Sequence, residues 1–132
     1  MTIKEKGQSL IEVLIAVAIA TIIVVVLVRI TSRSVTNATY ARNYSLATKY
    51  AQDSIEQARA LRELNSAAFF AGTSQCDLTD HPDQAEYFTR ARGCTLAVNG
   101  TTKTMSIEVT VSWQDNNGTH ASKLSTKLTN WK

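Results

Sequence analysis

The chain has 132 residues and a formal net charge of +3 at pH 7, with 44% apolar and 19% charged residues. A chain of this length holds one domain besides an N-terminal helix, and so mild a positive charge is by itself no footprint of nucleic-acid binding. Much of the apolar content lies in the first thirty residues, so the remainder can bury only a small core. The sequence contains no phosphate-binding glycine loop, serine–histidine–aspartate grouping or cofactor motif, which argues against an enzyme.

An apolar run from Leu10 to Val28 dominates the N-terminal part and contains only two polar side chains, Glu12 and Thr21. A run of about 20 apolar residues spans a bilayer as a helix. An ionised acid in hydrocarbon costs roughly 2.5–3.5 kcal/mol on insertion scales, so Glu12 requires a positively charged partner. The sequence therefore predicts a membrane-spanning helix in which Glu12 has a function.

A short basic leader precedes the apolar run and supplies that partner. Lys4 and Lys6 are followed by Gly7. Cleavage after Gly7 would turn the α-amino group of Gln8 into a positive charge near Glu12. This constellation resembles the class III signal of type IV pilins and type II secretion pseudopilins, although Gln8 stands where the family most often has phenylalanine. The resemblance implies cleavage between Gly7 and Gln8, N-methylation of Gln8, and a role for Glu12 in placing the subunit in a filament.

The same resemblance implies a structural subunit of a type IV pilus or a secretion pseudopilus, more similar to a minor subunit than to a major one. Its partners would be other pilin or pseudopilin subunits, the prepilin peptidase and the assembly platform of the inner membrane. The chain would cross the inner (cytoplasmic) membrane once, with a cytoplasmic N-terminus, and then enter an extracytoplasmic filament. A simple single-pass membrane anchor is the alternative. The expected division is a leader at 1–7, a transmembrane helix at 8–30, and the rest of the helix with a globular head at 31–132.

The helix is predicted to continue beyond the membrane, because no proline or glycine occurs between Gly7 and Gly72. After Arg29 the pattern becomes one-sided and forms the seam of an amphipathic helix. Alanine dominates this seam, so a covering sheet can approach closely; a partner helix is the alternative. We expect the helix to end between Asn65 and Ala71, with Gly72 as terminator. The seam consists of Tyr40, Tyr44, Ala47, Ala51, Ser54, Ala58 and Leu61.

The last forty residues alternate between apolar and polar side chains, as half-buried strands do. Two turns, Asn99-Gly100 and Asp115 to Gly118, divide them into three strands. The clearest strand has an apolar residue at every second position from Met105 to Trp113, and the last strand has Leu124 and Leu128 on one face. The predicted fold class is α+β, with a long N-terminal helix packed on a small three-stranded antiparallel sheet. The pilin resemblance implies the same fold.

An irregular segment, residues 73–93, separates the helix from the strands, and Cys76 and Cys94 bound most of it. An even cysteine count outside the cytoplasm indicates a disulfide, which would contribute about 3 kcal/mol for a loop of this size. Two free thiols or half of a metal site are the alternatives, but His81 and His120 give a poor zinc spacing. We expect no metal or cofactor. The acidic residues of the segment fit no calcium loop: Asp77, Asp80, Asp83 and Glu86.

Basic residues in the C-terminal half suggest a second hypothesis, a filament-tip subunit that binds DNA or adheres to a surface. Such a subunit would need a patch of cations for phosphate groups. The patch requires that the side chains converge on one face of the head. A nucleic acid would then be a further partner of the subunit. The candidate residues are Arg90, Arg92, Lys103, Lys123 and Lys127.

Overall fold

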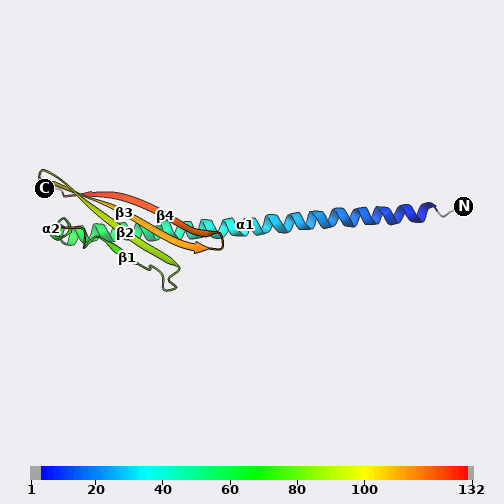
Figure 1. Cartoon of the computed structure of the whole chain (residues 1–132), viewed down its shortest axis with the longest axis horizontal. Coiled ribbons are helices and arrows are strands. Elements are labelled where there is room, and N and C mark those ends of the chain that lie inside the picture. Colours follow the sequence, from blue (N-terminus) through cyan, green and yellow to red (C-terminus); the bar gives the residue numbers. More distant parts are fainter. Residues whose placement is uncertain (1–3, 131–132) are drawn as a thin grey trace. The chain divides into compact units, whose positions relative to one another are not determined.

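The computed structural model describes the backbone of residues 4–130 and the side chains of residues 10–130. The chain divides into two compact units, Met1–Tyr40 and Ala41–Lys132, which are described separately. The elements follow in chain order as α1 (Lys4–Leu64), α2 (Ser66–Phe69), β1 (Leu78–Asp80), β2 (Phe88–Asn99), β3 (Thr102–Asp115) and β4 (Gly118–Thr129) (Figure 1).

The first unit consists of the N-terminal part of α1. It contains a segment that is long and apolar enough to cross a membrane, judged by length and composition alone. The described apolar side chains of this segment are exposed, and no other described part of the chain buries them. The Thr21 hydroxyl donates to the carbonyl oxygen of Val17 at 2.7 Å. This polar group is therefore satisfied inside the helix, as a bilayer requires.

In the second unit the helical seam faces the sheet. Ala47, Ala51, Ser54 and Ala58 are completely buried, which confirms the middle of the predicted seam and favours the covering sheet over a partner helix. These small side chains let the sheet approach α1 closely. The two ends of this part of the seam differ from the prediction, because Tyr44 is 46% exposed and Leu61 is 36% exposed.

The long helix ends at Leu64, one residue before the predicted range of Asn65 to Ala71, and α2 lies between this end and Gly72. Asn65 begins the short helix α2. The Asn65 side chain accepts a hydrogen bond from the backbone N–H of Ala68 at 3.1 Å, which satisfies one of the free donors of a helix N-terminus. α2 buries Phe69 and Phe70 follows it into the core.

The sheet has four strands, in the order β1-β2-β3-β4, with every neighbouring pair antiparallel (Figure 1). The sequence predicted three. The additional strand β1 and the first half of β2 lie in residues 73–93, which we expected to be irregular. Both predicted turns are present, with Gly100 at φ 60° and Gly118 at φ 124°, backbone conformations that favour glycine.

The core lies between α1 and the sheet. Every second residue of β3 enters it, and these side chains are almost fully buried: Met105, Ile107, Val109, Val111 and Trp113. The register pairs Met105 with Leu128, which is buried, and Val109 with Leu124, which is partly buried. The opposite face of the sheet carries the alternating polar residues. The predicted alternation of the C-terminal strands is therefore confirmed.

Candidate functional site

The predicted assembly segment lies at the start of α1. The helix backbone includes Gly7 and Gln8, whose side chains fall outside the described part of the chain. The Glu12 side chain is exposed and makes no hydrogen bond or ion pair with the described side chains of residues 10–130. Residues 8 and 12 are i and i+4 in the helix, so they occupy one face about 6 Å apart along the axis. The backbone therefore allows Glu12 to meet an amine at position 8, in its own chain or in a neighbouring one.

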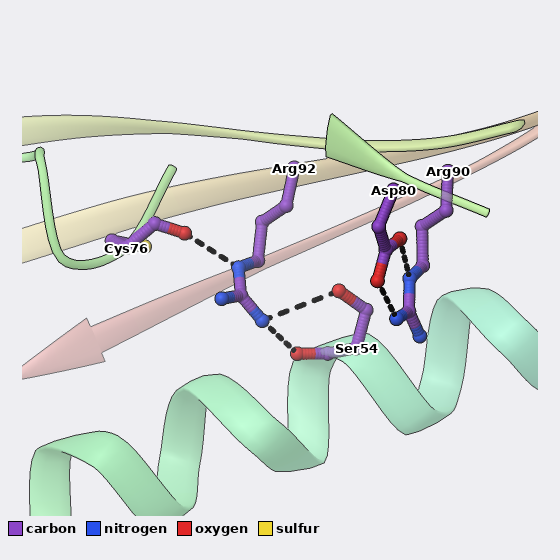
Figure 2. A network of polar contacts seen from close by, with 5 residues as sticks. All are labelled: Ser54, Cys76, Asp80, Arg90 and Arg92. Carbon is purple, nitrogen blue, oxygen red and sulfur yellow. Dashed lines mark hydrogen bonds and ion pairs between the residues drawn. The ribbon is translucent and has the colours of Figure 1, made fainter. Parts of the chain in front are cut away.

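A buried arginine connects several segments of the head. Arg92 of β2 is only 5% exposed and reaches across to α1. Its Nη1 donates to the carbonyl oxygen of Ser54 at 2.8 Å and to the Ser54 hydroxyl at 3.3 Å, and its Nε donates to the carbonyl oxygen of Cys76 at 2.6 Å (Figure 2). Burial, and then the charge of Arg90, lower the pKa of the Arg92 guanidinium. Arg92 therefore connects the helix, the sheet and the cysteine-bounded segment.

A second arginine forms an ion pair beside it. Arg90 donates from Nε to Oδ1 of Asp80 at 2.8 Å and from Nη2 to Oδ2 at 2.5 Å, a bidentate geometry (Figure 2). The hydrogen bond from Arg90 is the largest cause that lowers the pKa of the Asp80 carboxyl. The side chain of Arg90 is almost fully buried, whereas that of Asp80 is one-third exposed. This ion pair connects β1 to β2 on the face of the sheet that α1 covers.

Cys76 and Cys94 are joined by a disulfide with a Cα–Cα distance of 5.9 Å. The alternative of two free thiols does not apply, because the structure contains no free cysteine. The Asp77 side chain accepts a hydrogen bond from the backbone N–H of Cys94 at 2.8 Å and supports the same connection. Together with Arg92, these contacts hold residues 76–80 against β2.

The five predicted basic residues do not form one patch. Arg90 and Arg92 are buried on the face of the sheet that α1 covers. There they bind groups of the same chain, Asp80 and the Ser54 carbonyl oxygen. Lys103 donates to the carbonyl oxygen of Phe70 at 3.1 Å. Lys123 and Lys127 are exposed, and in β4 they alternate with the core-facing Leu124 and Leu128. Strand parity thus separates the cations between two faces.

The described residues contain no group of three or more histidine, cysteine, aspartate or glutamate side chains that could hold a metal ion. His81 is exposed. His120 lies in β4, where its Nε2 is 3.0 Å from Oδ1 of Asp115. The hydrogen bond from the backbone of Asn117 is the largest cause that lowers the pKa of the Asp115 carboxyl. Asp115 and His120 thereby stabilise the turn between β3 and β4.

The contact between Arg92 and Ser54 does not follow from the sequence patterns. Ser54 belongs to the predicted seam and Arg92 to the predicted basic patch, and neither pattern connects the two residues. One signal was available: Phe88, Arg90 and Arg92 are at alternating positions, so a strand that buries Phe88 also turns both arginines inward.

Comparison with known families adds one finding. The model of the prokaryotic N-terminal methylation motif matches residues 3–28. The chain carries this motif. No curated protein and no solved structure matches the chain. The methylation motif covers Gly7, Gln8 and Glu12 and continues into the apolar helix, which is consistent with a type IV pilin or pseudopilin. Proteins of this kind are structural, and the motif with its apolar helix indicates membrane anchoring and assembly with other pilin subunits.

Proposed function

We propose that this protein is a minor structural subunit of a type IV pilus or of a type II secretion pseudopilus. The observation that carries the proposal is the methylation motif at residues 3–28, in which a single carboxylate, Glu12, follows the leader glycine by five residues inside an apolar helix. A membrane anchor has no use for this acid, because it only adds to the cost of insertion. The minor status is part of the proposal and rests only on our interpretation of the alternating C-terminal strands.

Before assembly, the subunit resides in the inner membrane through α1, with its N-terminus in the cytoplasm and its head outside. The prepilin peptidase removes residues 1–7 and methylates the amine of Gln8. Assembly then transfers α1 from lipid into the core of a filament, where helices of other subunits cover the apolar side chains that α1 exposes as a single chain.

Glu12 acts in this transfer through its charge. In a filament core of low dielectric constant, a lone carboxylate is strongly unfavourable, whereas a carboxylate that meets the Gln8 amine of a neighbour is compensated. The pair forms only when the neighbouring helices are in register. The Glu12 carboxylate therefore selects the axial position of each incoming subunit.

The processing step is tested by intact-mass measurement of the protein purified from its native membrane. We expect a chain that lacks Met1 to Gly7 and carries one methyl group on Gln8. Gly7→Leu is the matched variant, and it should retain the leader and stay in the membrane fraction. A mature chain that begins at Met1 in cells with an active prepilin peptidase would contradict the proposal.

A further inference from the structure

The stretch of α1 that follows the apolar run is basic and contains no acid. Between Glu12 and Asp53 the sequence has no aspartate or glutamate, while four cations lie in this interval. Arg29 comes directly after Val28, the last residue of the apolar run, and Arg33 follows four residues later. The others are Arg42 and Lys49.

Arg29 and Arg33 are placed to act together. They are one helical turn apart, at i and i+4, so they share a face of α1. Both side chains are exposed, and neither makes an ion pair or hydrogen bond with the described side chains of residues 10–130. Two hydroxyl groups lie between the arginines in the sequence, and both are already bonded within the helix. The Thr31 hydroxyl donates to the carbonyl oxygen of Leu27 at 2.9 Å, and the Ser32 hydroxyl donates to that of Val28 at 3.0 Å. Ten guanidinium N–H donors, five on each arginine, are therefore available for an anion.

The length of the apolar run fixes the depth of this pair. Leu10 to Val28 is about 19 residues, which at a rise of 1.5 Å makes roughly 28 Å and matches a hydrocarbon core of about 30 Å. In a helix that crosses the bilayer, Arg29 then lies at the edge of the hydrocarbon and Arg33 about 6 Å farther out. This is the layer of the lipid headgroups, where phosphate groups are the abundant anions.

We propose that Arg29 and Arg33 bind the phosphate groups of anionic phospholipids in the leaflet at the C-terminal end of the span. Arginine suits this role because its planar guanidinium donates two parallel hydrogen bonds to a phosphate. The pair also has a cost, since cations that follow a span oppose the usual bias of basic residues toward the cytoplasmic side. Bound lipid compensates for that cost and fixes how deep α1 lies. The inference requires that α1 spans a membrane, not that the chain enters a filament; only the cost of the pair rests on the cytoplasmic N-terminus of the proposed function.

The test uses the full chain in nanodiscs that contain equal amounts of phosphatidylglycerol and phosphatidylcholine with the same acyl chains. Native mass spectrometry then counts the two lipids that stay bound when the chain is released. R29Q/R33Q removes two charges without harm to the helix, because glutamine is a good helix former. R42Q/K49Q is the matched control, since it removes the same charge from exposed positions farther along α1. R29K/R33K keeps the charge but loses the planar donors.

We expect the parent and R42Q/K49Q to retain phosphatidylglycerol in preference to phosphatidylcholine. R29Q/R33Q should lose this preference by roughly fivefold for each arginine, and R29K/R33K should retain part of it. An unchanged preference in R29Q/R33Q, or an equal loss in both glutamine variants, would overturn the proposal. If R29Q/R33Q keeps its lipids but enters filaments poorly, the pair contacts another subunit instead. Failure of leader cleavage or of assembly would contradict the proposed function and leave the lipid result unaffected.

Discussion

Arg92 in β2 donates a hydrogen bond from Nη1 to the backbone carbonyl oxygen of Ser54 in α1, at 2.8 Å, inside the core of the head. Its Nε holds the carbonyl oxygen of Cys76 at the same time. A single buried side chain thus connects three segments that are far apart in the sequence. All three oxygens that accept hydrogen bonds from Arg92 are uncharged. Arg92 therefore stabilises the fold through hydrogen bonds and not through an ion pair with a carboxylate.

Replacing Arg92 should therefore destabilise the head. Arg92→Met keeps the apolar stem but leaves the Cys76 carbonyl without its donor, so we expect the free energy of unfolding to fall by about 2 kcal/mol. Urea unfolding of the chain in detergent, followed by near-UV circular dichroism, measures the change. Ser54→Ala is the matched control, because it deletes only the 3.3 Å hydroxyl contact and should cost about 0.5 kcal/mol. Equal losses in the two variants would contradict this role of the Arg92 guanidinium.

The ion pair between Arg90 and Asp80 should make stability depend on pH. The pKa of the Asp80 carboxyl is lowered in the folded state, chiefly by its hydrogen bond from Arg90. The pair therefore contributes fully above the unfolded pKa of about 3.9, and its contribution is lost as the pH falls from there through the folded pKa. Asp80→Asn keeps the shape but removes the charge.

We expect Asp80→Asn to be less stable than the parent at pH 7 and to lose less stability between pH 5 and pH 2. The measurement is the free energy of unfolding as a function of pH for both proteins. Parallel pH profiles of the two proteins would show that the Asp80 carboxylate is not the group responsible.

The alternating strands could be predicted from the sequence, whereas β1 and the start of β2 could not. In β3 every inward position from Met105 to Trp113 is apolar, so the period of two is visible. In β2 the inward positions include Arg90 and Arg92, which give no apolar signal. Their burial depends on Asp80 and Ser54, partners that only the folded chain brings near. A strand of three residues such as β1 is too short to show any period.

The seam of α1 was predicted in position but not in extent. The steps of four and three between small residues identify the buried stripe, and Ala47 to Ala58 follow it. The same periodicity includes Tyr44 and Leu61, which are partly exposed, because a helical period does not reveal how far the covering sheet extends. The prediction of a single basic patch was wrong for a related reason. The residue type alone does not specify on which face of a strand a side chain lies. Cleavage at Gly7 and the role of Glu12 remain predictions.

The alanine seam should tolerate no larger side chain. Ala51 is fully buried in the core, so Ala51→Leu adds three carbon atoms at a position without solvent exposure. We expect a loss of about 1–3 kcal/mol in the free energy of unfolding, typical of an overpacked core. Gln52→Leu is the neighbouring control at an exposed position and should change stability by less than about 0.5 kcal/mol. If Ala51→Leu were as stable as this control, the close approach of α1 and the sheet would be wrong.

Removal of the disulfide should loosen the head without affecting the helix. Cys76 and Cys94 are separated by 18 residues, and a bridge across such a loop contributes about 3 kcal/mol in the chain-entropy model. We expect the double substitution to serine to lower the melting temperature, while the helical circular dichroism signal stays unchanged at room temperature. Arg92 still holds the Cys76 carbonyl, so the combination with Arg92→Met should lose more than either change alone. An unchanged melting temperature would show that the bridge adds no stability.

The share of Glu12 variants in filaments tests the central claim most directly. The measurement is the ratio of this subunit in sheared surface filaments to that in the membrane fraction, for the variant and for the parent. Glu12→Ala leaves the Gln8 amine uncompensated, which in a buried pair costs roughly 3–5 kcal/mol. Glu12→Gln keeps the shape and the hydrogen bonding but deletes the charge. We predict that both variants insert in the membrane and are cleaved, yet enter filaments poorly. A ratio equal to that of the parent in both variants would contradict assembly through Glu12 and leave a simple membrane anchor.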